Sequence, residues 1–365
     1  MKLACTQENL QKGLSIVGRV VSRNATLPVL GNVLLKTETG GLKLVATDLE
    51  VGVTCIVGGK VEQAGEITIP ARLLAEYINQ LPREHVTLHT DGKELRVACQ
   101  ETSAEIKGIG ADEFPLLPAF KSVFEAVLPA DQFKEAISQV ITAVAHDESR
   151  PELTGVYLQF GAGGCTLAAT DSFRLAERTI PVKGAVTERA VIVPLKTMAE
   201  IGRIIEPVDS VVLRLSENQI KCSYKNIELI SRLIEGHYPP YKDILPKKLP
   251  TRCVVNREEF IGAVRSAGLF SKTAAQDVVV SVNAEKKQLQ IQAEANQVGG
   301  HHQKLAASIL GPSDRVVFNY RYLVEGLQTF TSEKIIFETG GSSSPGQLTA
   351  PESTGYLYIL MPIKV

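Results

Sequence analysis

The 365-residue sequence lacks the short motifs that mark common catalytic and cofactor sites. It has no GxxxxGKS/T phosphate loop, no HExxH zinc motif, no GxSxG nucleophile motif and no EF-hand loop. The glycines between Gly161 and Gly164 do not complete a GxGxxG fingerprint, and we expect them in a turn between strands. A long chain without such motifs is typical of a binding or scaffold protein, so we expect neither catalysis nor a cofactor.

Net charge and long apolar runs are also lacking. The 39 basic and 40 acidic residues give a net charge of −1, which provides no bulk attraction to nucleic acid or acidic lipid. Any contact with DNA must therefore use a local basic surface. No apolar run approaches the roughly 18 residues of a membrane span, and the first residues are not typical of a signal peptide. We expect a cytoplasmic protein.

Clusters of metal-binding residues are absent as well. The six cysteines form no CxxC pair, so nothing favours zinc or thioredoxin-like chemistry, and we expect buried, reduced thiols. His85 and His89 lie four residues apart in strand-like sequence without a third ligand, which favours a surface pair. His301 and His302 follow two glycines, and we expect them in a solvated turn. No metal site is predicted.

A Thr-Asp pair recurs after an alternating apolar run. It occurs at Thr47-Asp48 and again at Thr170-Asp171, 123 residues later (170 − 47). Because Asp can accept a hydrogen bond from the backbone two residues on, the pair predicts a turn between strands. The repeated position favours a structural role for Asp48 and Asp171 over a role as catalytic acids.

Helix-start signals recur in the same way. One set begins at Thr6, Asp131 and Asn256 and is predicted to run to Val21, Val144 and about Phe270. A second set follows Pro70, Pro194 and Asn319, where Pro suits a first helical turn and Asn suits a cap. Equivalent positions in successive copies are 123 to 127 residues apart. Leu10, Phe133 and Phe260 give the two limits (133 − 10 and 260 − 133).

Three copies of one unit therefore make up the chain, each with two helices among short alternating strands. Runs of neighbouring strands with few helices favour antiparallel sheets covered by helices on one side, which is the α+β class. We expect domains at residues 1–122, 126–247 and 250–365.

Several short motifs follow one another along the whole chain. They are TLPVLGN (26–32), TDL (47–49), IPAR (69–72), SRPELTGV (149–156), TDSFRLA (170–176), FNYRYL (318–323) and YILMPIKV (358–365). In this order they resemble the bacterial DNA sliding clamp family, the beta subunit of DNA polymerase III. The resemblance implies three tandem domains of the DNA-clamp fold and a head-to-tail homodimer that forms a ring around duplex DNA. It also implies a processivity factor without catalysis of its own.

A size estimate agrees with a dimeric ring. A domain of about 120 residues has a diameter of about 35 Å. Three such domains leave a gap of only about 5 Å, whereas six leave about 35 Å, enough for a duplex about 20 Å wide. A ring around DNA therefore needs two chains.

The resemblance implies a cleft between the second and third domains that binds short peptide segments of the polymerase, the clamp loader and repair proteins. Carried over by motif, its lining is Arg150, Leu153, Thr170, Phe173, Arg174, Leu175, Pro239, Ile244, Ile359, Met361, Pro362 and Lys364. The apolar members would form a slot for a Leu or Phe side chain, and Arg150, Arg174 and Lys364 would lie at the rim. Core packing is the alternative for the apolar members. Phe173 and Lys364 differ from the common His and Arg of the family, which leaves the peptide preference open.

Two further sets follow from the resemblance. The helices would face DNA with Lys12, Arg19, Arg23, Arg72, Lys134, Lys196, Arg203 and Arg265. Acidic residues lie among them, so solvated helix faces would look much the same. The dimer seam would use Leu73 and Ile106 of the first copy and Leu269 and Phe270 of the third, for which a core role is the alternative.

Two other hypotheses stay open. One is a three-repeat scaffold that binds proteins without encircling DNA. The other is an enzyme of unknown type in which Asp48 and Asp171 act as acids, although the missing motifs count against it.

Overall fold

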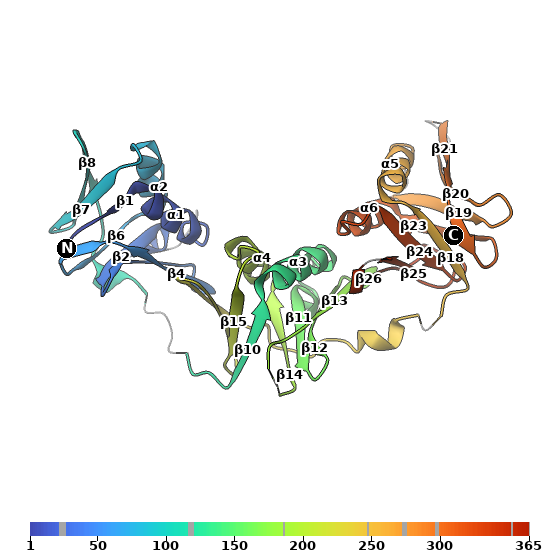
Figure 1. The fold of residues 1–365 in the computed structure, drawn as a ribbon, viewed down its shortest axis with the longest axis horizontal. Helices are drawn as coiled ribbons and strands as arrows, with labels where there is room; N and C mark the ends of the chain where they lie inside the picture. Colours follow the sequence, from blue (N-terminus) through green and yellow to red (C-terminus); the bar gives the residue numbers. More distant parts are fainter. Residues whose placement is uncertain are drawn as a thin grey trace. The chain divides into compact units, whose positions relative to one another are not determined.

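The computed structural model describes residues 1–21, 27–115, 120–184, 187–246, 248–271, 276–295, 299–351 and 353–364. Within these ranges it contains six α-helices, two for each predicted copy (Figure 1). They are α1 (Gln7–Val17), α2 (Ala71–Gln80), α3 (Ala130–Val140), α4 (Leu195–Ile204), α5 (Arg257–Gly268) and α6 (Tyr320–Gln328). The predicted helix starts are confirmed to within a residue.

Side-chain caps explain several of these starts. The Thr6 hydroxyl accepts a hydrogen bond from the backbone N–H of Asn9, and the Asn256 side chain accepts one from Glu259. The predicted ends of the first set were too late. The first helix ends at Val17 instead of Val21, because Gly18 and the residues after it form a turn in which the Val20 N–H donates to the Val17 carbonyl.

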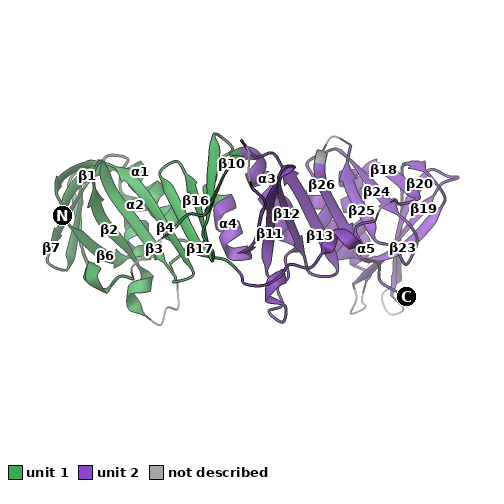
Figure 2. Ribbon diagram, turned by 90° about the horizontal axis from the view of Figure 1, so that it is seen from below, with its two compact units in different colours: residues 1–130, 203–233 green, residues 131–202, 234–365 purple. Residues whose placement is uncertain are grey.

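The chain packs into two compact units (Figure 2). The first unit comprises residues 1–130 and 203–233, and the second comprises residues 131–202 and 234–365. The middle copy is therefore divided between them, and its strands join sheets with both of its neighbours in sequence.

The first unit contains two antiparallel sheets. Their strands from the first copy are β1 (Lys2–Thr6), β2 (Asn32–Glu38), β3 (Gly41–Thr47), β4 (Val51–Gly58), β5 (Lys60–Gln63), β6 (Glu66–Pro70), β7 (His85–Asp91), β8 (Glu94–Cys99) and β9 (Thr102–Lys107). Those from the middle copy are β10 (Phe124–Pro129), β15 (Ser210–Leu215), β16 (Gln219–Tyr224) and β17 (Ile227–Arg232). The strand orders are β5-β1-β7-β8-β9 and β10-β15-β16-β17-β4-β3-β2-β6, so β17 and β4 connect the two copies.

The second unit repeats this arrangement. Its strands from the middle copy are β11 (Gly155–Gly161), β12 (Gly164–Thr170), β13 (Arg174–Ile180) and β14 (Arg189–Pro194). Its strands from the third copy are β18 (Thr251–Asn256), β19 (Asp277–Asn283), β20 (Gln288–Ala295), β21 (Gly299–Ala306), β22 (Ser308–Leu310), β23 (Asp314–Asn319), β24 (Lys334–Thr339), β25 (Gly346–Ala350) and β26 (Ser353–Leu360). The strand orders are β14-β11-β12-β13-β26-β25-β24-β18-β22 and β21-β20-β19-β23, so β13 and β26 connect these copies.

Helix faces and alternating strand residues form the core. Leu10, Leu14 and Val17 are buried along one face of α1, which packs on β3 and β4. All six cysteines are buried and free, as expected. Burial raises the pKa of the Cys5 thiol to about 11 and that of Cys165 to about 12, so these thiols stay protonated and inert at neutral pH.

One predicted turn is a strand. His301 and His302 lie in β21, which pairs with β20 from Gly299 onward, so the two glycines begin a ladder instead of a loop. Of the helices that the structure describes, none is long and apolar enough to cross a membrane.

Candidate functional site

The second Thr-Asp pair forms a turn held by its own side chains. The Thr170 hydroxyl donates to the Arg174 carbonyl at 2.6 Å and accepts from the Ser172 N–H at 3.1 Å. Asp171 Oδ1 accepts from the N–H groups of Phe173 and Arg174 at 2.9 and 3.0 Å. These bonds hold Ser172 at a φ of 77°.

The first Thr-Asp pair has the same geometry. The Thr47 hydroxyl donates to the Val51 carbonyl at 2.9 Å, and Asp48 Oδ1 accepts from the N–H groups of Glu50 and Val51 at 3.0 and 2.7 Å. Leu49 has a φ of 78°. Both carboxylates are therefore engaged in building turns, which confirms the predicted structural role and leaves the enzyme hypothesis without its candidate acids.

Arg174 begins β13 directly after the second turn. We expected it at the rim of the cleft, and this is wrong, because its side chain is only 6% exposed. Its guanidinium lies between Asp171, at 2.9 Å, and Glu325 of α6, and it stacks over the Tyr322 ring at 4.4 Å. Burial opposes the charge, but Tyr358, Glu325 and Asp171 together raise the pKa of Arg174 above its usual value.

Three of the predicted apolar lining residues are core residues. Leu153, Leu175 and Ile359 are almost completely buried. Leu175 and Ile359 face each other across β13 and β26 and pack with Tyr241 of the segment that leads from β17 to β18. Burial, together with the hydrogen bond to Glu177, raises the pKa of the Tyr241 hydroxyl and keeps it a donor. These residues therefore belong to the core of the second unit.

Exposed apolar side chains lie next to these core residues in the sequence. Phe173 is 61% exposed, and Ile244 and Met361 are also exposed. Phe173 stacks with Tyr322 at a ring distance of 6.4 Å, and its carbonyl accepts a hydrogen bond from the Met361 N–H at 2.9 Å. Phe173, Tyr322 and Met361 therefore form one apolar surface, which we call the Phe173 surface.

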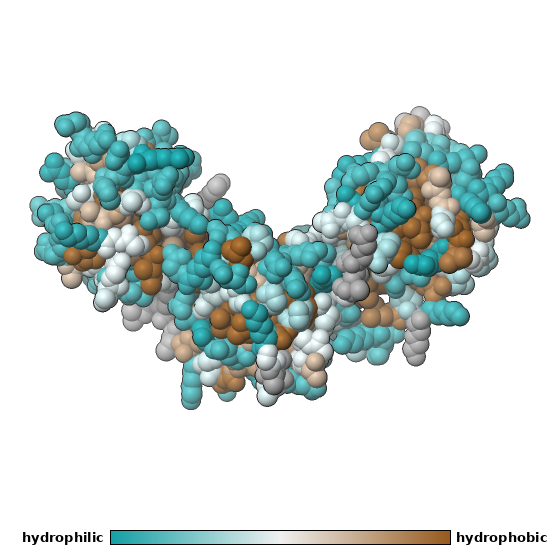
Figure 3. Space-filling view, in the orientation of Figure 1, coloured by the Kyte–Doolittle hydropathy of each residue, from teal (hydrophilic) through white to brown (hydrophobic). Residues whose placement is uncertain are grey.

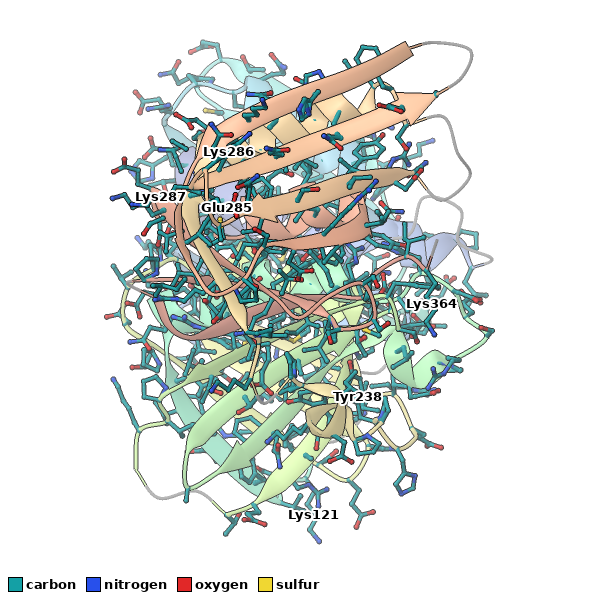
Figure 4. The ribbon with its side chains drawn as sticks, turned by 90° about the vertical axis from the view of Figure 1, so that its right-hand side faces the viewer. Lys121, Tyr238, Glu285, Lys286, Lys287 and Lys364 are labelled. Carbon is teal, nitrogen blue, oxygen red and sulfur yellow. The ribbon has the colours of Figure 1, made fainter. Side chains whose placement is uncertain are left out.

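The other residues predicted for the cleft differ in exposure. Arg150 is exposed and donates to the Ser172 hydroxyl at 3.3 Å, and Lys364 is exposed in the C-terminal tail. Thr170 is buried within its turn, and Pro239 and Pro362 are half-buried. Figure 4 labels Lys364 and Tyr238, the latter stacked on Tyr157 at 4.8 Å.

Sequence reasoning missed Tyr322, Tyr241 and Glu325 as members of this site. Tyr322 lies inside the FNYRYL motif, and Tyr241 ends the segment Tyr238-Pro239-Pro240-Tyr241. The motif marked the first segment and the predicted cleft residue Pro239 lies in the second, but only the fold brings them together with the turn.

Of the predicted DNA-facing residues that the structure describes, all but one are exposed. Lys134 is half-buried, Arg23 lies outside the described residues, and the exposed ones are Lys12, Arg19, Arg72, Lys196, Arg203 and Arg265. Hydrophilic residues cover most of the surface over α1, α2, α5 and α6 on the face drawn in Figure 3.

Acidic residues neutralise two of these cations within the first unit. Lys12 pairs with Glu206 at 2.9 Å, and Arg72 pairs with Glu76 at 2.7 Å. Glu206 also binds Lys225 at 2.6 Å, and hydrogen bonds from Lys225 and Lys12 lower the pKa of Glu206 to about 2. The basic surface of this unit is therefore weaker than its sequence suggests.

The predicted seam residues differ in exposure. Leu73 of α2 and Leu269, just after α5, are well exposed. Ile106 is buried on β9, so it is a core residue and is not exposed to a partner in the single chain. Phe270 is half-buried and stacks on His301 at 5.9 Å.

Comparison with known proteins gives matches along the chain. Three family models of the DNA polymerase III beta subunit match: the N-terminal domain at residues 1–118, the central domain at 127–240 and the C-terminal domain at 242–364. The beta sliding clamp of Synechococcus elongatus is 31% identical over 373 residues and that of Synechocystis sp. 29% over 389 residues, each covering 100% of both chains. The crystal structure of a sliding clamp from Pseudomonas aeruginosa bound to griselimycin has a TM-score of 0.95 at 26% identity and covers 100% of both chains.

Proposed function

Because the chain belongs to the DNA polymerase III beta subunit family, we propose that it is a DNA sliding clamp that encircles duplex DNA and tethers the replicative polymerase. The observation that carries this proposal is the succession of three family matches over one chain whose fold agrees with a solved clamp from end to end. Asp48 and Asp171 accept backbone hydrogen bonds that form their turns, which is a structural role. This role supports a protein that acts by binding.

The working form is a head-to-tail homodimer in the cytoplasm. Two copies of three domains, with boundaries at residues 1–122, 126–247 and 250–365, supply the six domains that a ring around a duplex needs. The exposed Leu73 and Leu269 belong to the first and third copies, whose free ends would meet in such a ring. Half-buried Phe270 would complete this seam.

Contact with DNA is loose and independent of sequence. The exposed basic residues of the helices reach phosphates, and pairing of Lys12 and Arg72 with neighbouring acids keeps each contact weak. Weak contacts suit a protein that is held by topology and must slide, because tight phosphate binding would slow its movement.

Partner proteins bind at the Phe173 surface through short peptides. Phe173 and Met361 supply exposed apolar area next to the core cluster of Leu175, Ile359 and Tyr241, and the exposed Ile244 follows Tyr241 three residues later. Arg150, which donates to Ser172, and Lys364, three residues after Met361, are exposed cations that would meet carboxylates or carbonyls of the peptide. Met adapts to varied ligand shapes, as several partners would require.

Primer extension tests the proposal. The chain is loaded onto a singly primed circular template with a clamp loader, ATP and a polymerase III core, and product length per binding event is measured. The proposal predicts much longer products with the chain than without it. Equal lengths, together with a monomeric mass of 39.5 kDa in sedimentation equilibrium, would favour a scaffold that does not encircle DNA.

A further inference from the structure

The turn that precedes β13 needs no arginine. The same hydrogen bonds form the turn at Thr47-Asp48, where Val51 occupies the position equivalent to Arg174 (174 − 123). Val51 is buried, as Arg174 is. A buried cation costs desolvation that a buried valine does not. Arg174 must therefore do something that the first copy does not require.

Arg174 joins the turn to helix α6 of the third copy. Its Nε lies 2.9 Å from Asp171, in its own turn, and its Nη1 binds Glu325, which lies 151 residues further along the chain. The same Nη1 lies 3.5 Å from the Tyr358 hydroxyl, and that hydroxyl donates to the Tyr322 carbonyl at 3.1 Å. One guanidinium thus connects the turn, β26 and α6.

This connection positions the Phe173 surface. Tyr322 has Arg174 against its ring at 4.4 Å and Phe173 stacked with it at 6.4 Å, so the guanidinium and the exposed phenyl ring contact the same tyrosine. Glu325 supplies the α6 carboxylate that binds the guanidinium, and it lies one turn beyond Tyr322 on the same helix. If Glu325 loses its charge, the guanidinium loses its carboxylate partner on α6, and Tyr322 and Phe173 lose their mutual alignment.

We propose that Glu325 is a positioning residue for the partner site: through Arg174 it fixes Tyr322 and Phe173 in the orientation that binds peptide. The inference rests on the proposed function, because it concerns the same peptide-binding surface. It assigns the charges that meet the peptide to the exposed Arg150 and Lys364, whereas Nε and Nη1 of Arg174 already bind carboxylates. The partner is accordingly a peptide whose apolar side chains enter an aligned aromatic surface.

Two measurements on the full-length chain test this assignment. The first is the affinity for a fluorescein-labelled decapeptide with Leu and Phe at its C-terminal end, measured by fluorescence anisotropy. Glu325→Gln should weaken binding about tenfold. This factor lies within the range of interaction energies found between residues that contact each other. The Glu325 side chain is 43% exposed, so the neutral amide is tolerated and the variant folds. Glu258→Gln is the matched control, because it removes an Arg–Glu pair at the start of α5, and it should change the affinity less than twofold.

The second measurement needs no peptide. The sequence contains no tryptophan, so Phe173→Trp introduces a single reporter at the surface itself. In this background Glu325→Gln should shift the emission to longer wavelength and lower its anisotropy, whereas Glu258→Gln should do neither. A purely structural role for Glu325 would lower the unfolding midpoint and leave the emission of the folded protein unchanged.

The double variant of Arg174→Ala and Glu325→Gln should bind the decapeptide about as weakly as either single variant, because both remove one connection. A full loss with Arg174→Ala and none with Glu325→Gln would overturn the inference and make Arg174 a direct peptide contact. If the parent chain bound no decapeptide, the proposed function would fail, and the tryptophan comparison would still decide the role of Glu325.

Discussion

Replacing Phe173 by Ala tests whether the Phe173 surface binds partner peptides. The side chain is 61% exposed, and because a Phe side chain has about 200 Å² of surface, about 120 Å² is open to a ligand. At about 25 cal/mol per Å², complete cover would contribute about 3 kcal/mol. Incomplete cover and ordering of the side chain reduce this, so we expect a loss of about 1.5 kcal/mol, or about tenfold in Kd.

Fluorescence anisotropy with the labelled decapeptide measures this loss. Leu49→Ala is the matched control, since Leu49 is an apolar residue of the equivalent turn in the first copy and is 53% exposed. It should leave the Kd unchanged. Phe173→Ala should also leave urea unfolding within about 0.5 kcal/mol of the parent, because the side chain is mostly solvated. Equal Kd values for the two variants would refute the assignment of this surface.

Further predictions concern charge and packing. Glu206→Gln should steepen the salt dependence of DNA affinity by about one to two charges, because it frees two lysines for phosphates; an unchanged slope would contradict this. The folded pKa of Glu206 is lowered to about 2 from 4.5, so its ion pairs stabilise the fold above pH 4.5, and the acid-unfolding curves of parent and variant should converge as the pH falls toward 2. Gly326→Ala should destabilise the chain by about 1–3 kcal/mol in urea unfolding, because a Cβ there would overlap the buried Tyr358 ring. Gly262→Ala on α5, where a Cβ meets nothing within 4 Å, should instead stabilise by up to about 1 kcal/mol.

Local signals in the sequence predicted the elements well. Helices start where Thr6, Asn256 and Asn319 can cap, because capping depends only on residues a few positions away. The Thr-Asp turns were predictable for the same reason. The family resemblance was also confirmed, since it depended on the order of many short motifs and not on any one of them.

Long-range pairing was not predictable from these signals. Nothing near β4 or β13 indicates that they pair with β17 and β26 of the following copy, since register across copies is set by the packed fold. The burial of Arg174 has the same origin, because its partner Glu325 is 151 residues away. The family resemblance carried this arginine over to the rim of the cleft, and nothing in its local sequence indicated burial.

Topological retention on DNA tests the central claim most directly. The chain is loaded onto a nicked circular plasmid with a clamp loader and ATP, and bound protein is separated from free protein by gel filtration before and after a single restriction cut. A ring that encircles DNA stays on the circle in salt that abolishes binding to short linear duplexes, and it leaves once the plasmid is linear. Equal retention on circular and linear plasmid would contradict encirclement and favour direct binding to DNA.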